Sequence, residues 1–267
     1  MAYNFDMRKD AFEKVFVKLC EQLQSEITDA ANKWTIKGFI DTKQSVFTIS
    51  QDTKIISKIL ELHILPQIVR FADTIDFNVV LADHQNYYPD MTFVSKSDSS
   101  VKYAVDIKTT FRRGNNAGFT LGSHGAYFIN RSSTKNIQFP YQEYKAHYVL
   151  GIIYDRNEKA DEREVFTISD SDKINSVIKN LQVFFAEKWK IAGDKQGSGN
   201  TANIGSVTNM NDLINGTGIF TKYTDGEKLF DDYWMNYGKI SVADKDGKTH
   251  KIVSLKEFIK YRGGDNQ

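Results

Sequence analysis

Apolar residues near the start of the chain recur every three to four positions, which is typical of an amphipathic helix. We therefore expect a helix over about residues 10–32 that packs through one face. That face carries Phe12, Val15, Phe16, Leu19, Leu23 and Ile27. Two short strands should follow over residues 36–40 and 45–49, joined by a turn near residues 41–43.

A second helix is predicted to begin at Asp52, whose side chain can cap the helix N-terminus. Pro66 should kink or restart this helix, which continues to about residue 71. Further along, the pattern indicates a short helix over residues 141–147, an apolar strand over 148–154, and helices over 227–237 and 255–262. A chain of 267 residues suits one large domain or one domain with a subdomain.

Between the second helix and the apolar strand lies a hairpin pattern, with strands over residues 91–94 and 101–108 around a turn at 97–100. Successive side chains of a strand point to opposite faces of the sheet. One face of the second strand is apolar and belongs to a core, whereas the other is polar. The apolar face holds Val101, Tyr103, Val105 and Ile107, and the polar face holds Lys102, Ala104, Asp106 and Lys108.

Folding of this hairpin would bring Asp90 toward Asp106 and Lys108. Two carboxylates can bind a hard cation such as Mg²⁺ through oxygen. A lysine beside them can assist an attacking water and stabilise charge that develops on phosphorus. Alternating charges also occur on the solvent face of many ordinary hairpins, so a site without chemistry stays open on this pattern alone.

The composition limits the classes of protein to which this chain can belong. The chain has 267 residues, of which 40% are hydrophobic and 26% charged, as in ordinary globular domains. It contains no apolar run of membrane-spanning length and no secretory signal, so we expect a cytoplasmic protein with no membrane partner. The lone Cys20 should be a buried thiol, and the five histidines are too dispersed to suggest a zinc site.

The formal net charge of +1 argues mildly against a nucleic-acid partner, because phosphate binding usually leaves a basic footprint. The distribution of charge along the chain, in contrast, favours such a partner. Residues 102–145 hold seven basic side chains and two acidic ones, which would suit a polyanionic substrate near the hairpin. Such runs are more often solvated surface.

A glycine-rich segment over residues 196–203 is the other unusual stretch. Its spacing nominally fits a dinucleotide-binding pattern, but no apolar helix follows it and it has no Gly-Lys-Ser/Thr ending. It is either a flexible surface loop or a loop whose backbone amides and Asn side chains meet a ligand.

Several motifs together resemble the type II restriction endonucleases of the PD-(D/E)xK family. The resemblance rests on segments spread over most of the chain: residues 50–54, 61–62, 85–86, 88–90, 106–110, 119–122, 134–137, 188–189, 191–194, 197–201 and 203–206. It implies a single endonuclease domain over residues 1–267, of class α/β (α+β), with a central mixed β-sheet flanked by helices. It also implies a homodimer acting on palindromic double-stranded DNA. The implied target is GATATC, cut to blunt ends with 5′-phosphates. A separate DNA methyltransferase would protect host DNA, with no direct contact implied.

The resemblance also assigns roles to residues. Asp90 and Asp106 would bind Mg²⁺, Glu61 would be an accessory carboxylate, and Lys108 would orient or activate water. The loop at 196–206 would read the major groove through Gly197, Ser198, Gly199, Asn200, Thr201 and Asn203. Gln85 and Asn86 would lie at the minor groove, and Thr53, Thr110 and Lys135 would contact the DNA backbone. The dimerisation region would fall within about residues 1–50, where the apolar helix face is a candidate interface.

The chain departs from the family pattern at several points. Ala202 replaces a threonine, the loop over 122–133 is longer, Arg112 and Arg113 add charge, the N-terminus is extended, and the C-terminal tail lacks a basic ending. Two other classes stay open. A repair or recombination nuclease would need the carboxylates and lysine without the glycine-rich loop, whereas a silent DNA-binding module would need the loop without the catalytic residues.

Overall fold

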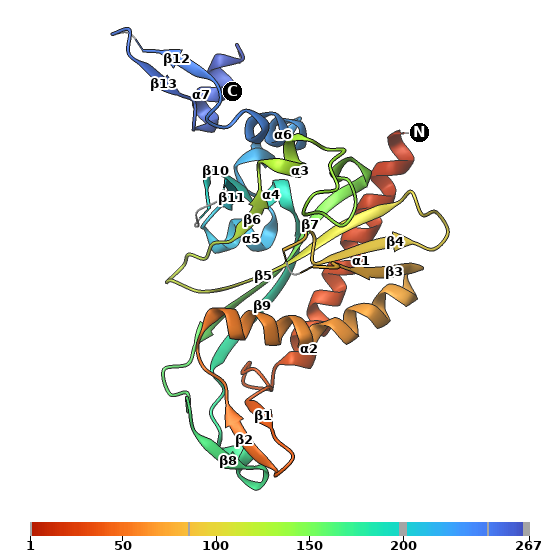
Figure 1. Ribbon diagram of the computed structural model, residues 1–267, viewed down its shortest axis with the longest axis vertical. Helices are drawn as coiled ribbons and strands as arrows, with labels where there is room; N and C mark the ends of the chain where they lie inside the picture. The colour runs from red at the N-terminus through yellow and green to blue at the C-terminus, as the bar shows by residue number, and fades with distance from the viewer. Residues whose placement is uncertain (1, 85, 198–201, 245, 264–267) are drawn as a thin grey trace.

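A computed structural model describes residues 2–84, 86–197, 202–244 and 246–263, with side chains from Lys9 onward (Figure 1). The chain folds around a mixed five-stranded sheet in the order β3-β4-β5-β7-β9. Its strands are β3 Phe77–Leu81, β4 Met91–Ser95, β5 Lys102–Phe111, β7 Tyr144–Arg156 and β9 Ile178–Glu187. β5 and β7 are parallel, and the other neighbours are antiparallel.

Two long helices cover one face of this sheet: α1 Ala2–Ile27 and α2 Thr53–Thr74. The predicted apolar face of β5 packs there, in a cluster that also contains Phe12, Phe16 and Leu23 of α1. Phe16 stacks on Phe185 of β9 with ring centroids 4.2 Å apart. The alternation predicted for β5 is therefore confirmed, and the buried aromatic side chains fix α1 against the sheet.

The opposite face of the sheet carries a second apolar cluster built mainly from the C-terminal half of the chain. Its helices are α3 Ala126–Ile129, α4 Lys188–Ile191, α5 Met210–Asn215, α6 Gly226–Asn236 and α7 Leu255–Tyr261. A three-stranded sheet, in the order β10-β11-β6, also belongs to this side, with β6 Thr120–Ser123, β10 Ala192–Gln196 and β11 Asn203–Ser206. Short 3₁₀ turns at Tyr141–Glu143 and Ile219–Lys222 connect these elements, and the hairpin of β12 Ser241–Ala243 and β13 Thr249–Lys251 lies near the C-terminus.

A separate lobe lies at the other end of the molecule (Figure 1). It is a three-stranded sheet of β1 Gly38–Ile40, β2 Ser45–Thr48 and β8 Val165–Thr167, followed by a 3₁₀ turn at Ile168–Lys173. In the view of Figure 1, α2 lies between this lobe and the five-stranded sheet. Within the described residues, no helix combines the length and apolar character needed to cross a membrane.

The mixed architecture, both hairpins, the Asp52 cap and the two C-terminal helices agree with the sequence predictions. The cap is direct, since Asp52 accepts the N–H of Lys54 at 2.8 Å and that of Ile55 at 3.3 Å. Cys20 is buried as predicted.

Three local predictions were wrong. The first helix ends at Ile27, because Asp29 accepts the backbone N–H groups of Ala31 and Lys33 and forms a turn. The restart predicted as one alternative for the second helix was wrong, because Pro66 lies inside an uninterrupted α2, whereas the other alternative, a kink at Pro66, stays a prediction. Residues 144–147 belong to β7 rather than to a helix, because parallel pairing with β5 extends back to Tyr144.

Candidate active site

The polar face of β5 and the segment before β4 form the candidate site. Asp106 and Lys108 lie on the same face of β5, and Asp90 comes directly before β4. The Asp90 Oδ2 atom accepts the backbone N–H of Ile107 at 2.7 Å, and Lys108 Nζ lies 2.5 Å from Asp106 Oδ2. The antiparallel pairing of β4 with β5 therefore brings the three predicted side chains together.

The pKa values of Asp90 and Lys108 depend on burial and on the charged groups beside them. Burial and, after it, the neighbouring Asp106 raise the pKa of Asp90 to about 7, although Lys108 and the Ile107 N–H oppose the rise. Burial alone would lower the pKa of Lys108, but Asp106, Asp90 and Glu61 outweigh that cost and raise it. Lys108 thus holds its proton as a cation, whereas burial beside Asp106 disfavours the charged form of Asp90.

The donor set suits a hard divalent cation. Asp90 and Asp106 offer adjacent carboxylate oxygens, and mutual repulsion between them would be relieved by a cation. Across the described residues, no group of three or more Asp, Glu, His or Cys side chains is close enough to hold a metal ion alone. Mg²⁺ usually binds through one or two carboxylates and keeps several waters, so this pair is sufficient for it.

Glu61 approaches the cluster from helix α2. It lines a cavity of about 720 Å³ together with Asp90, Ile107 and His84. Its carboxylate is held by Lys58 of the same helix, with Lys58 Nζ 2.6 Å from Glu61 Oε1. Glu61 therefore borders the site, with its carboxylate paired to Lys58.

The chain has known relatives. The sequence profile of the family described as restriction endonuclease EcoRV matches residues 30–263. The type II restriction enzyme EcoRV of Escherichia coli is 36% identical over 251 residues, covering 92% of this chain and 99% of that enzyme. This chain belongs to the EcoRV family. It is a type II restriction endonuclease, a site-specific deoxyribonuclease that acts on double-stranded DNA.

The segment that the family resemblance assigns to base recognition is part of the sheet on the C-terminal side. Gly197 follows β10, Asn203 begins β11, and the Gly197 N–H donates to the Asn203 carbonyl at 3.0 Å. Ser198, Gly199, Asn200 and Thr201 lie outside the described residues. No apolar helix follows the segment: β11 does, and it pairs with β6. The dinucleotide-binding alternative therefore has no structural support.

The hairpin formed by β10 and β11 is closely packed. At Gly205 a Cβ atom would lie 2.5 Å from the Lys195 carbonyl oxygen, so no other residue fits there without a shift of the backbone. His124, after β6, donates its N–H to the carbonyl of Ala202 at 2.9 Å, and its ring nitrogen Nε2 lies 2.9 Å from the Gln196 amide nitrogen. These contacts anchor both ends of the segment.

The remaining predicted DNA contacts are dispersed over the surface. Thr53 begins α2 and is half-buried, Thr110 lies near the end of β5, and Lys135 is exposed after α3. Asn86 is exposed in the segment before Asp90, and Gln85 lies outside the described residues. Their roles in this EcoRV-family enzyme stay predictions.

Sequence reasoning missed one charged residue behind the site. Lys188, the first residue of α4, is only 2% exposed, and its ammonium group has no hydrogen-bond partner. A lysine inside the apolar stretch 181–191 was the available indication, because lysine is almost never fully buried unless it is paired.

Proposed function

We propose that this enzyme hydrolyses double-stranded DNA in a Mg²⁺-dependent reaction at GATATC, leaving blunt ends with 5′-phosphates. The convergence of Asp90, Asp106 and Lys108 beside an open cavity carries the chemical part of the proposal. Membership of the EcoRV family supports the target. A separate methyltransferase that modifies the same sequence would protect host DNA.

Each group of the site has a role in this reaction. Asp90 and Asp106 would hold Mg²⁺, which when bound supplies a Lewis acid for the phosphate. Lys108 remains a cation beside Asp106, so it can orient the attacking water and stabilise the negative charge that develops on the phosphate oxygens. The cavity leaves room for the scissile phosphate next to these residues.

The decisive experiment compares two lysines on the same face of β5. Lys108→Met should lower the single-turnover cleavage rate about a hundredfold to a thousandfold, the usual cost of losing one preorganised donor. Lys102→Met is the matched control, because Lys102 pairs with Glu143 at 3.0 Å outside the site. It should cleave within about threefold of wild type, because its ion pair with Glu143 does not involve the proposed catalytic residues. Equal rates for both variants would contradict the assignment of Lys108.

A silent DNA-binding module is excluded if the wild-type protein cleaves a mapped plasmid with Mg²⁺ and not without it. A repair nuclease of the same fold would cleave without preference for GATATC. Fragment sizes from that digestion therefore separate the three classes.

Base reading is proposed for the segment from Gly197 to Asn203. Base edges in the major groove discriminate by about 1–3 kcal/mol per good bidentate contact, whereas non-specific binding depends on phosphate contacts. Asn200→Ala or Asn203→Ala should therefore depress cleavage of a GATATC duplex far more than binding to unrelated DNA at one salt concentration. A proportional fall in both would remove this segment as the reader.

We also propose that the enzyme works as a homodimer, because a palindromic duplex presents two equivalent half-sites. The apolar face of α1, predicted as an interface, is not available, since Phe12, Phe16 and Leu23 are buried in the core of the same chain. The lobe offers a different surface. Phe39 lies opposite Phe47, which lies opposite Val165, and the three side chains are 53%, 44% and 60% exposed. A second copy covering this apolar row would bury it.

A further inference from the structure

Lys188 is a buried charge with no counter-ion in contact. Its side chain is 2% exposed, and none of the ion pairs of the described chain includes its Nζ atom. Burying an ammonium group without a partner destabilises a fold, unless nearby groups compensate. Such a residue therefore needs an explanation beyond stability.

An aromatic cage surrounds the ammonium group. Lys188 Nζ lies 4.9 Å from the ring centroid of Tyr88, 5.7 Å from that of Phe128 and 5.8 Å from that of Tyr141. Aromatic faces attract cations, so the cage partly compensates for lost hydration. His147 stacks on Tyr141 at 3.9 Å, and its pKa is well below the ordinary value because of burial and the nearby Lys188 and Arg131. The imidazole is thus neutral and does not add a second positive charge.

The cage adjoins the catalytic cluster. Tyr88 precedes Pro89 and Asp90 in the chain, and its hydroxyl lies 3.0 Å from His147 Nδ1 on β7. Asp106 shares its face of β5 with Ala104, which is buried in the same apolar cluster as Tyr88, Phe128 and Tyr141. The caged lysine and the Asp106 side chain therefore lie on the same side of the five-stranded sheet.

Charge on Lys188 responds to the same cluster. Burial lowers the pKa of Lys188 to about 8, and among the neighbouring charges Asp106 opposes that fall most, while Lys108 adds to it. In a dry environment two charges interact over longer distances than they do in water. Asp106 thus lies under the influence of two cations, Lys108 in direct contact and Lys188 at longer range.

We propose that Lys188 is a positioning residue of the catalytic centre. Its caged ammonium group attracts the Asp106 carboxylate from inside the protein, and it adds positive charge to the site at which the metal ion and the scissile phosphate would bind. This inference rests on the proposed metal-dependent cleavage. Because like charges repel, the Lys188 cation weakens the binding of a divalent ion. Because the phosphate gains negative charge during the reaction, the same cation favours the chemical step.

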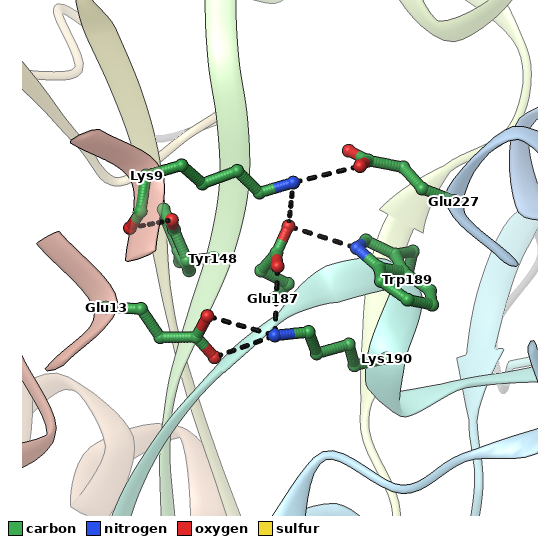
Figure 2. A network of polar contacts seen from close by, with 7 residues as sticks. All are labelled: Lys9, Glu13, Tyr148, Glu187, Trp189, Lys190 and Glu227. Carbon is green, nitrogen blue, oxygen red and sulfur yellow. Dashed lines mark hydrogen bonds and ion pairs between the residues drawn. The ribbon is translucent and has the colours of Figure 1, made fainter. Parts of the chain in front are cut away.

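Lys190, on the same turn, provides the contrast. Figure 2 shows it in a network that joins α1, α4 and α6. Lys190 Nζ lies 2.9 Å from Glu13 Oε2 and 3.0 Å from Glu187 Oε1. Glu187 also pairs with Lys9 at 2.5 Å and accepts the indole N–H of Trp189 at 3.0 Å. Lys190 is therefore a structural cation that is paired with two carboxylates.

The test compares Lys188→Met with Lys190→Met in the full-length protein. Each variant is titrated with Mg²⁺ alone by calorimetry, assayed for single-turnover cleavage at saturating Mg²⁺, and unfolded by denaturant. Lys188→Met should bind Mg²⁺ at least threefold more tightly, cleave at least tenfold more slowly and be no less stable than wild type. Lys190→Met should lose stability but keep the Mg²⁺ affinity and the cleavage rate. Lys188→Gln is measured in parallel, so that the result does not depend on how methionine packs.

Opposite changes in metal affinity and rate are the signature of a charge effect, since simple loss of structure would weaken both. Unchanged Mg²⁺ binding and cleavage in both Lys188 variants would overturn the proposal. So would weaker Mg²⁺ binding together with lower stability, which would make Lys188 a packing residue. If wild type binds Mg²⁺ but does not cleave DNA, the proposed function fails, whereas the calorimetric comparison still decides the effect of Lys188 on the metal site.

Discussion

The five-stranded sheet and the three-stranded sheet of the lobe differ in how much of their apolar surface is buried. The five-stranded sheet is covered on both faces by the same chain, and Phe93, Leu150 and Ile152 are fully buried. The lobe of β1, β2 and β8 buries Val46 but leaves Phe39, Phe47 and Val165 open to solvent. One sheet is thus complete in a single chain, whereas the other has an unpartnered apolar row.

This difference separates two tasks. Catalytic groups must be held in fixed positions, and the covered sheet supplies the rigid strand that holds the proposed catalytic residues Asp106 and Lys108. Association needs a surface that is still exposed when the chain has folded, and the lobe supplies it. We therefore expect substitutions in the first region to change stability or chemistry, and substitutions in the second to change self-association.

The largest expected effect is the loss of a core aromatic side chain. Phe16→Ala should lower the free energy of unfolding by about 3–5 kcal/mol, because it removes a fully buried ring that stacks on Phe185. Phe39→Ala should change it by less than about 0.5 kcal/mol in the monomer, since that ring is exposed. Denaturant unfolding at low protein concentration measures both. Similar losses in the two variants would show that the lobe is as firmly integrated as the main sheet.

Self-association should show the reverse order, with substitutions in the lobe changing it more than substitutions in the core. Replacing Phe39 and Phe47 by lysine puts two charges into the apolar row, and burying them against a second copy would be costly. The double variant should sediment as a monomer at concentrations where wild type is a dimer. Val17→Lys is the control, because Val17 is an exposed apolar residue on α1, 46% exposed and outside the row. A dimer that survives the double substitution but is lost in Val17→Lys would place the interface on α1 instead.

Much of this architecture could be predicted from local patterns, and the exceptions have physical causes. Strict alternation identified β5, because one of its faces is apolar and the other polar. Tyr141, Tyr144 and Tyr148 are spaced by three and four residues, as in a helix, but pairing with β5 makes the chain a strand from Tyr144 onward. Pairing between strands that are distant in the sequence overrides the local spacing of apolar residues, and that spacing cannot predict the pairing.

Part of the candidate site could likewise be predicted from local patterns, and part of it could not. Asp90, Asp106 and Lys108 could be placed together because a single hairpin joins them, and the structure brings them into contact. The base-reading loop was inferred only from the resemblance to a family. The environment of Lys188 could not be inferred, because its cage combines the segment before β4, α3, the 3₁₀ turn before β7, and α4. Only the folded chain shows that this lysine lacks a partner.

The smallest expected effect concerns α2, which joins the two regions and carries Glu61. Because Lys58 Nζ lies 2.6 Å from Glu61 Oε1, Lys58→Gln would free the carboxylate and leave the cavity more negative. The Mg²⁺ concentration for half-maximal cleavage should then fall, and in Glu61→Gln it should rise. Each shift should be roughly twofold to fivefold, the size expected from a partly exposed ion pair. Cleavage rates measured across a Mg²⁺ series give both values. If neither variant shifts the midpoint, Glu61 is a solvated residue of α2, and the catalytic site is confined to the five-stranded sheet.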